Sequence, residues 1–323
     1  MDPLTHSLTG VMLGRAGLGK LYPRSTVLLI LAANAPDIDI VAASGGALNY
    51  LHYHRWITHS VLFLPVMALL PALLVCGLRK SFAGAGRAWL IAAIAVASHL
   101  ILDWTNSYGI RLLSPVSERW FRGDLTGVVD LWIWAALLLA VAAPMLGRLV
   151  SAEMGARKGS GEGAAWAALV FLCFYDGGRS LLHERAVATL ESRVYEGSPP
   201  VRAAAIPSMA NPLAWQGLVE TRSYLRVYDL NLAGSFDPDA GETFYKPEPS
   251  RALAAASETR AFRWLLDFCP YPIWSVAADA TVEKATSVVV RDARFGFSAS
   301  ALVDAAGRVI GQSFGLRDVN RGN

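Results

Sequence analysis

The stretch "HRWITHSVLFLP" at residues 54–65 places two histidines and an arginine directly before a long apolar run. That run continues without a charged residue from Ser60 to Leu78. A helix needs about 20 predominantly apolar residues to cross a bilayer, so this segment comes close to the required length. The stretch therefore predicts a membrane helix that begins beside a group of ionisable side chains.

The composition of the whole chain is also typical of a membrane protein. Of its 323 residues, 54% are hydrophobic and 17% are charged, and the mean hydropathy is +0.36. The formal net charge is only +3, which leaves no basic field of the kind that nucleic-acid binding requires. We therefore expect a membrane-embedded protein with no nucleic-acid partner.

The long apolar runs are concentrated in the first 183 residues. They lie at Ser60–Leu78, Ala88–Leu102, Val128–Val150 and Ala164–Tyr175. Two weaker segments, 4–19 and 25–41, predict a helical hairpin that packs against the other helices. The alternative is a soluble all-helical core, but apolar runs this long and this free of charge are uncommon in soluble helices.

The basic residues predict how these helices are oriented, because cytoplasmic connections of membrane proteins are enriched in lysine and arginine. Three connections are basic, and their residues are Arg15, Lys20 and Arg24; Arg79, Lys80 and Arg87; and Arg148, Arg157 and Lys158. The other connections are then expected outside the cytoplasm. They contain nearly all the histidines and the clustered aspartates, so these side chains are predicted to share one membrane face.

The spacing of these residues indicates a metal site. His99 and Asp103 are four residues apart near the end of an apolar segment, so they project from one helix face. Asp37 and Asp39 follow a proline in "PDID", a geometry that brings two carboxylates near one or two cations. His54 and His59 are five positions apart, which places them about 140° from each other on a helix. We therefore expect His59 in the first turn of the helix and His54 in the loop before it.

His6, at the start of the first helix, adds one more imidazole. Together these residues form a mixed nitrogen and oxygen set that suits zinc, manganese or a similar divalent ion. Each residue has an ordinary alternative: a polar cap for His6, solvated charges for the aspartates, a hydrogen-bonded helix end for His99 and Asp103, and a headgroup contact for Arg55. Their joint occurrence favours a functional site over these alternatives, since ionisable residues at membrane depth are rare.

Several blocks of sequence resemble a known family. They are "MDPLTHSLTG" at 1–10, "PDID" at 36–39, "HRWITHS" at 54–60, and "HLILDWTNSYGIRLLSPVSERW" at 99–120 followed by Asp124 and Asp130. In this order they resemble the YdjM-like family of bacterial inner-membrane, metal-dependent hydrolases. "NPLAWQGL" at 211–218 resembles the family more loosely. The resemblance implies a hydrolase embedded in the bacterial inner membrane.

A more distant similarity is to zinc-dependent phospholipase C and related nucleases. It implies that His6, Asp37 or Asp39, His59, His99 and Asp103 contribute to a phosphoesterase metal site. The chain lacks the further histidines and the glutamate that hold a third metal in those enzymes. One or two zinc ions, or manganese, are therefore expected.

The second part of the chain has a different pattern. Alternating segments at 217–232 and 297–315 predict antiparallel hairpins, the second with "DAAG" as its turn, and 250–268 has helical periodicity. The predicted fold is an α-helical membrane domain over residues 1–183, with several membrane helices, followed by a smaller α+β extracytoplasmic domain over residues 184–323.

These observations predict a metal-dependent hydrolase that acts on a phospholipid or lipid-linked phosphoester at the outer membrane–water interface. His6, Asp37, Asp39, His59, His99 and Asp103 are expected to hold the metal, with Asp37 or Asp39 as the alternative general base. His54 and Arg55 would stand at the entrance, and Asn106, Asp124 and Asp130 would orient the histidines. A transporter or a non-catalytic structural or regulatory membrane protein with a metal site remains the alternative.

Overall fold

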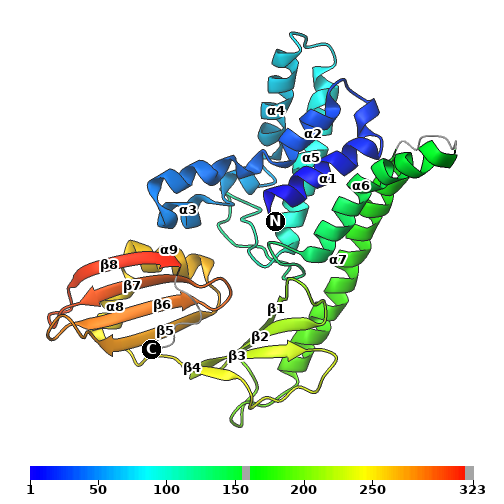
Figure 1. Ribbon diagram of the computed structural model, residues 1–323. Coiled ribbons are helices and arrows are strands. Elements are labelled where there is room, and N and C mark those ends of the chain that lie inside the picture. Colours follow the sequence, from blue (N-terminus) through cyan, green and yellow to red (C-terminus); the bar gives the residue numbers. More distant parts are fainter. Residues whose placement is uncertain (155–160, 317–323) are drawn as a thin grey trace. The chain divides into compact units, whose positions relative to one another are not determined.

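The computed structural model describes residues 1–154 and 161–316 (Figure 1). The contacts within the chain divide it into two units. The helical unit comprises Met1–Asp39, Arg55–His183 and Pro207–Pro212, and the sheet unit comprises Ile40–His54, Glu184–Ile206 and Leu213–Asn323. Residues 40–54 thus belong by their contacts to the sheet unit, although the helical unit precedes and follows them in the sequence.

The helical unit is built from six helices. They are α1 (Pro3–Arg15), α2 (Ser25–Ala33), α4 (Leu64–Leu78), α5 (Ala85–Thr105), α6 (Leu131–Met154) and the first part of α7 (Glu162–Glu191). 3₁₀ turns cover Leu18–Lys20, Ile57–His59 and Pro36–Gly45, and of the last only residues 36–39 belong to this unit. Asp2 caps α1, since its carboxylate accepts hydrogen bonds from the backbone N–H groups of Leu4 and Thr5.

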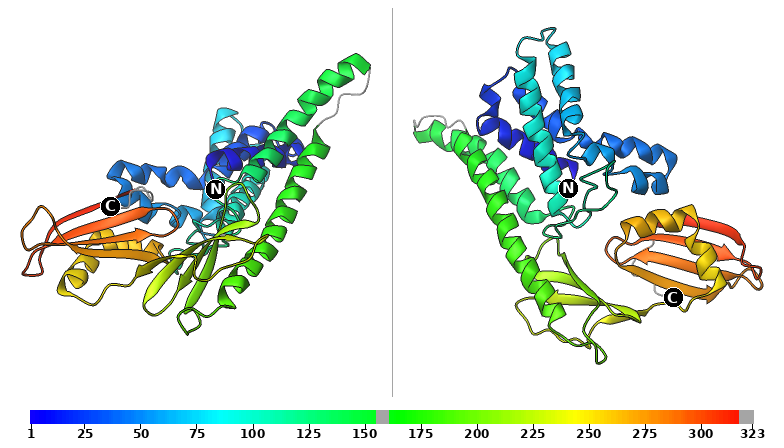
Figure 2. Two further views of the ribbon diagram at one scale, coloured as in Figure 1. Left: turned by 60° about the horizontal axis from the view of Figure 1, so that its bottom comes forward. Right: turned by 180° about the vertical axis from the view of Figure 1, so that it is seen from behind.

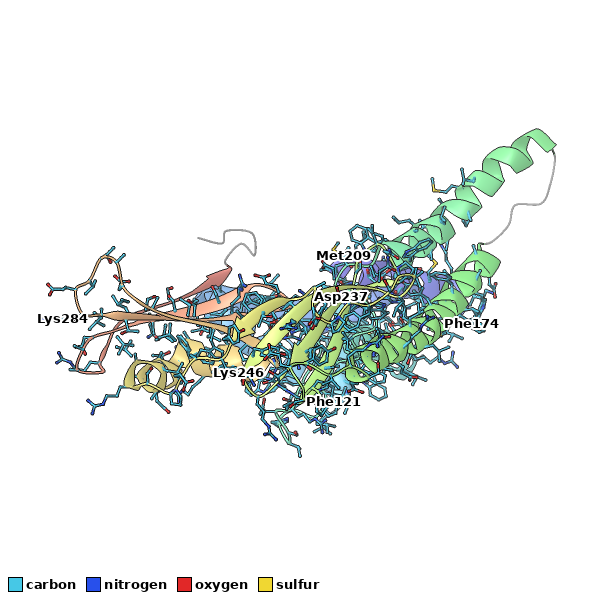
Figure 3. The ribbon with its side chains drawn as sticks, turned by 90° about the horizontal axis from the view of Figure 1, so that it is seen from below. Phe121, Phe174, Met209, Asp237, Lys246 and Lys284 are labelled. Atoms are coloured by element: carbon cyan, nitrogen blue, oxygen red, sulfur yellow. The ribbon has the colours of Figure 1, made fainter. Side chains whose placement is uncertain are left out.

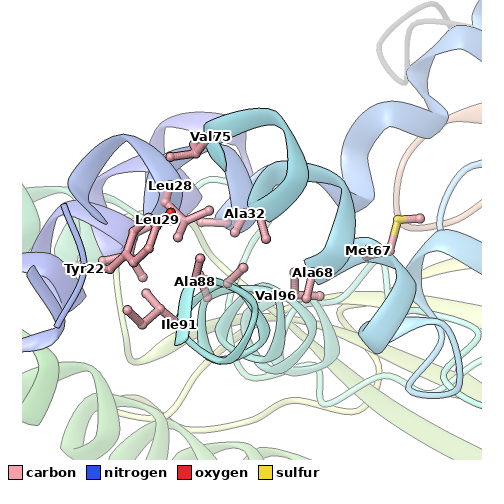
Figure 4. Packing of buried hydrophobic residues seen from close by; sticks show 14 of the residues in the cluster. Tyr22, Leu28, Leu29, Ala32, Met67, Ala68, Val75, Ala88, Ile91 and Val96 are labelled. Carbon is pink, nitrogen blue, oxygen red and sulfur yellow. The ribbon is translucent and has the colours of Figure 1, made fainter. Parts of the chain in front are cut away.

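Helices α2, α4 and α5 pack around a common apolar core, drawn in Figure 4. Alanines of α5, including Ala88, Ala92 and Ala95, are fully buried and let the neighbouring helices approach closely. Helix α1 crosses α2 at Gly10, where an added Cβ would lie 2.8 Å from the backbone oxygen of Leu29. Because His6 is four residues before Gly10, the close crossing also brings His6 against the rest of the unit.

Within the described ranges, α5 is the one helix long and apolar enough by itself to cross a membrane. Two bent pairs would each qualify as a broken span: Ser25–Ala33 with Pro36–Gly45, bent by 47°, and Ala47–His59 with Leu64–Leu78, bent by 86°. The apolar part of α6, Leu131–Gly147, is shorter. The described residues thus contain one clear apolar span, α5, and the prediction of several membrane helices is not confirmed.

The outer surfaces of the helices are apolar nevertheless. Leu70, Leu74, Leu139 and Phe174 are large side chains of α4, α6 and α7 that are 46%, 52%, 65% and 77% exposed. Figure 3 shows Phe174 on the outside of α7. Soluble monomers rarely expose apolar surface of this extent, so this pattern agrees with a helical unit embedded in lipid.

The sheet unit contains two four-stranded sheets. The first has the order β1 (Arg202–Pro207), β2 (Ala214–Glu220), β3 (Tyr224–Asn231) and β4 (Glu242–Tyr245), and the second has the order β5 (Pro272–Ala278), β6 (Thr286–Asp292), β7 (Phe297–Val303) and β8 (Val309–Leu316). The predicted hairpins are the antiparallel pairs β2–β3 and β7–β8, with residues 304–307 in the second turn. Both hairpin predictions are confirmed.

Three short helices complete the sheet unit: α3 (Ala47–Tyr53), α8 (Arg251–Ser257) and α9 (Arg260–Phe268). The helical periodicity at 250–268 is thus divided between two helices. The break falls at Thr259, whose side chain accepts a hydrogen bond from the N–H of Phe262 and starts α9. Helices α8 and α9 pack on the sheet β5–β8, as the two views in Figure 2 show.

Candidate metal centre

Four side chains converge where several elements of the helical unit end. His99 and Asp103 lie in the last two turns of α5, Asp37 in the 3₁₀ turn after α2, and His59 at the end of the 3₁₀ turn Ile57–His59. Each offers one nitrogen or oxygen atom, and all four atoms lie within 4.8 Å of one another. His59, His99 and Asp103 are completely buried, whereas the side chain of Asp37 is 20% exposed.

The distances within this group match those of a metal's ligands. The Nε2 atoms of His59 and His99 are 3.0 Å apart, and Asp103 Oδ2 lies 3.3 Å from each. Asp37 Oδ1 lies 3.5 Å from His59 Nε2 and 3.8 Å from His99 Nε2. Four ligands arranged tetrahedrally about 2.0–2.1 Å from a zinc ion are about 3.3 Å from one another. The group therefore has the spacing and the donor set of a divalent-ion site.

Neighbouring groups orient both imidazoles toward this centre. His99 Nδ1 lies 2.7 Å from the backbone oxygen of Ala33. That oxygen belongs to the last turn of α2, whose carbonyls have no partner within their own helix. His59 Nδ1 lies 3.2 Å from Asp39 Oδ2. When each Nδ1 donates to its oxygen, each Nε2 is left with the lone pair that binds a metal.

Asp39 therefore lies behind His59 and outside the group of four. Its Oδ2 also accepts hydrogen bonds from the backbone N–H of Arg55, at 2.8 Å, and from the Thr58 hydroxyl, at 3.0 Å. The sequence could not separate the places of Asp37 and Asp39, because both follow Pro36 within three residues. His59 also differs from the prediction: it lies in a 3₁₀ turn before α4 and outside the helix, which begins at Leu64.

Arg55 is part of the interior of this site. Its side chain is 2% exposed, and its guanidinium lies 3.1 Å from Asp103 Oδ1 and donates to Asn106 Oδ1 at 3.1 Å. Asn106 Nδ2 in turn donates to Asp103 Oδ1 at 3.1 Å. The amino group of Met1 also contacts this oxygen. The predicted place of Arg55 at the entrance is therefore wrong, whereas Asn106 contacts a member of the group of four as expected.

His6 lies next to the group of four. Its ring stacks on His99 with 3.7 Å between the ring centroids, and its Nε2 is 3.4 Å from Asp103 Oδ1. Burial lowers the pKa of His6 well below its usual range, so the ring is neutral at neutral pH. Neither ring nitrogen has a hydrogen-bond partner among the described residues. A ligand role for His6 stays a prediction.

Three further predicted site residues are His54, Asp124 and Asp130. His54 ends α3 and stacks on Tyr50, and its predicted place at the entrance stays a prediction. Asp124 occupies a left-handed backbone conformation, with φ of 52°, in the loop before α6. Asp130 accepts hydrogen bonds from the N–H groups of Trp132 and Ile133 and from the Tyr175 hydroxyl. It caps α6, so its predicted role of orienting the histidines is wrong.

Sequence reasoning missed two partners of the histidines. One is the backbone oxygen of Ala33, which carries no side-chain signal. The other is Thr58, whose hydroxyl lies 3.1 Å from His59 Nδ1 and donates to Asp39. Its position directly before His59 in "WITHS" is a signal that could have been used.

Comparisons with known proteins support a membrane location. The family model described as YdjM inner membrane protein matches residues 1–186. Protein YfhP of Bacillus subtilis, described as uncharacterized, is 33% identical over 155 residues, 44% of this chain and 46% of that protein. Inner membrane protein YbcI of Escherichia coli is 33% identical over 123 residues, 36% of this chain and 69% of that protein.

The chain thus spans less than half of the length of the first of these relatives. No solved structure matches it. The family match covers more than half of the chain and includes every member of the group of four. This chain belongs to the YdjM inner membrane protein family.

Proposed function

We propose that the protein is a metal-dependent hydrolase of the bacterial inner membrane that acts on a phospholipid or a lipid-linked phosphoester. The observation that carries this proposal is the close grouping of one ligand atom each from Asp37, His59, His99 and Asp103, all within 4.8 Å of one another. Asp37 is the one partly exposed member of the group, so in this proposal a water approaches the ion from its side, as a fifth ligand beside the four protein ligands.

Asp37, His59, His99 and Asp103 would hold one divalent ion, zinc or manganese, and His6 is close enough to take part in binding a second. Such an ion lowers the pKa of a bound water and polarises a phosphoryl oxygen. Asp37 faces the two imidazoles with Oδ1, while its Oδ2 has no hydrogen-bond partner among the described residues. Oδ2 is therefore the atom that would accept a proton from water as general base.

Arg55 and Asn106 keep Asp103 in place in this proposal. Both donate toward Oδ1, which leaves Oδ2 directed at the two imidazoles. The guanidinium also offsets the charge of Asp103, so that a bound divalent ion keeps more of its attraction for an anionic phosphate.

The apolar outer surfaces of the helices favour a substrate that is itself dissolved in the membrane. A lipid carries its polar headgroup at the membrane–water interface, and the group of four lies at the end of α5, the clearest span. By the distribution of basic connections, we place this end of α5 at the extracytoplasmic face of a multi-pass helical unit.

The alternative is a structural or regulatory ion in a non-catalytic membrane protein. The complete burial of His59, His99 and Asp103 favours it, because a structural ion is enclosed by protein ligands. A transporter is disfavoured, since transport sites lie near the middle of the membrane and these residues gather at one end of the span.

An assay on three classes of ester distinguishes these functions. Zinc- or manganese-loaded protein in detergent would be incubated with lipid phosphodiesters, phosphomonoesters and carboxylic esters. We expect turnover of a phosphoester that stops on chelation and falls about 100-fold or more in Asp37→Asn, because a general base contributes about 10²–10⁴-fold. His183→Ala is the control. Activity that survives both chelation and Asp37→Asn contradicts the proposal, and failure on every ester favours the non-catalytic alternative.

A further inference from the structure

A second set of possible metal ligands adjoins the group of four. It consists of Asp37, Asp39 and His54, and one nitrogen or oxygen atom of each lies within 4.8 Å of the others. Asp39 and His54 are buried, whereas the side chain of Asp37 is partly exposed. We call these three residues the second group. Asp37 is the member that it shares with the group of four.

The closeness of His54 to Asp39 follows from the chain itself. A peptide bond joins His54 to Arg55, and the backbone N–H of Arg55 donates to Asp39 Oδ2 at 2.8 Å. The N–H of His54 donates to the backbone oxygen of Tyr50, and the two rings stack with 4.5 Å between their centroids. Both the backbone and the ring of His54 are therefore fixed beside the 3₁₀ turn that carries the two aspartates.

Asp37 can serve both groups, because its two carboxylate oxygens have different surroundings. Oδ1 lies 3.5 Å from His59 Nε2 and 3.8 Å from His99 Nε2. Oδ2 is buried and has no hydrogen-bond partner among the described residues. A buried polar atom without a partner is costly, and a bound cation would remove that cost. Two-metal sites hold their ions about 3.5–4 Å apart, a separation that one carboxylate can bridge.

The donor set of the second group suits a divalent ion. Two carboxylates and one imidazole are oxygen and nitrogen ligands of the kind that zinc and manganese accept. Three protein ligands leave a position for water. Binding should be weaker than in the group of four, because one protein ligand fewer is present and the first ion and Arg55 already offset much of the negative charge of the aspartates.

We propose that Asp37, Asp39 and His54 form a second, weaker site for a divalent ion, with Asp37 as the shared ligand. This site differs from one built around His6, which stacks on His99 and is outside the second group. Its effect on activity rests on the proposed function, in which Asp37 Oδ2 accepts a proton from water. An ion bound to Oδ2 prevents this, so an excess of divalent ion should inhibit hydrolysis.

The test counts bound ions and does not require turnover. Metal-free protein in detergent would be titrated with zinc in competition with a chromophoric chelator. The wild type should bind a first ion tightly and a second more weakly, and His54→Ala should lose the second ion and keep the first. His52→Ala is the matched control and should keep both, since His52 lies on the same helix, stacks on Trp264 and belongs to neither group.

A spectroscopic measurement on the wild type does not depend on any variant. Two manganese ions about 3.5–4 Å apart that share a carboxylate are magnetically coupled. The electron paramagnetic resonance spectrum should therefore change from that of an isolated ion to that of a coupled pair as the second ion binds. Isolated-ion spectra at every manganese concentration would overturn the second site. Loss of the second ion in His6→Ala together with its retention in His54→Ala would overturn it as well.

The outcomes separate this inference from the proposed function. A second ion that depends on His54, in a protein that hydrolyses no ester, supports the second site and contradicts the enzyme. Hydrolysis by a protein that binds a single ion at every zinc concentration supports the enzyme and overturns the second site. Where both are present, excess zinc should slow hydrolysis in the wild type and in His52→Ala but not in His54→Ala. Equal inhibition of all three would contradict the inhibitory role.

Discussion

Asp103 serves two sets of neighbours with its two carboxylate oxygens. Oδ2 lies 3.3 Å from the Nε2 atoms of both histidines, while Oδ1 lies 3.1 Å from the Arg55 guanidinium and accepts a hydrogen bond from Asn106. Removing its charge would take away a metal ligand and also leave a buried arginine without its counter-charge, which is strongly destabilising. A residue that only orients a ligand is therefore a cleaner probe of the site.

Toward the group of four, Asp39 has this orienting position, because its Oδ2 lies 3.2 Å from His59 Nδ1. Asp39→Asn should lower the affinity for zinc by about 10–100-fold, because loss of a carboxylate behind a ligating histidine has effects of that size. Competition with a chromophoric chelator measures this affinity. Asp237→Asn, in an exposed loop, is the control and should bind zinc as the wild type does. An unchanged affinity in Asp39→Asn would show that Asp39 does not orient a ligand.

At the scale of residues, the sequence predicted which residues belong to the candidate metal centre better than it predicted the role of each one. Helical spacing was sufficient to pair His99 with Asp103. It could not decide between Asp37 and Asp39, because the direction of each carboxylate depends on a 3₁₀ turn. It also assigned Asp130 to the site, because the start of α6, where Asp130 acts as a cap, is not visible in an apolar run.

At the scale of elements, the crossing of α1 over α2 depends on Gly10. Gly10→Ala should lower the free energy of unfolding by about 1–3 kcal/mol, because the new Cβ would lie 2.8 Å from a backbone oxygen of α2 that cannot move aside easily. Chemical unfolding in detergent measures the change. In Gly77→Ala on α4 the new Cβ meets open space, and we expect up to about 1 kcal/mol of stabilisation. Equal effects of the two substitutions would contradict the close crossing.

The first sheet is held by an ion-pair network at Glu220 of β2. Its carboxylate accepts hydrogen bonds from Arg202 and Lys246, both at 2.7 Å. Burial alone would raise the pKa of Glu220, but the two cations outweigh burial and lower it. The carboxylate therefore stabilises the folded state above its unfolded pKa, and this contribution is lost as the pH falls through its folded pKa.

Glu220→Gln should accordingly cost about 1 kcal/mol at pH 7, and the difference from the wild type should shrink as the pH is lowered below about 4. Urea unfolding followed by circular dichroism over this pH range measures it. Glu283→Gln, whose parent carboxylate is 89% exposed, is the control. A difference that grows on acidification would contradict this account.

The elements themselves were predicted well where a simple periodicity decides them. The hairpins β2–β3 and β7–β8 follow from alternation and turn residues. The beginning of α4 was not predictable, because the apolar run starts at Ser60 but the chain first makes a turn in which the Ser60 hydroxyl donates to the backbone oxygen of Ser114. That bond links segments 54 residues apart, and local sequence patterns carry no information about such contacts.

At the scale of the whole molecule, the orientation in the membrane is the main prediction. Basic residues assign three connections to the cytoplasm, although Arg157 and Lys158 lie outside the described residues, and nothing is described of the Arg148 side chain. A reporter fused after Asn323 that is active only outside the cytoplasm should therefore be active. A reporter active only in the cytoplasm, fused at the same place, should be silent. Activity of the cytoplasmic reporter alone would contradict the proposed topology and indicate the opposite orientation.

The central claim is that Asp37, His59, His99 and Asp103 hold a divalent ion. Its most direct test is the metal content of protein purified from membranes, measured together with the X-ray absorption of the bound metal. We predict about one tightly bound ion per chain, with nitrogen and oxygen ligands at about 2.0–2.1 Å, that is lost in His99→Ala and kept in His183→Ala. Metal content equal in His99→Ala and the wild type, or sulfur among the ligands, would contradict the claim.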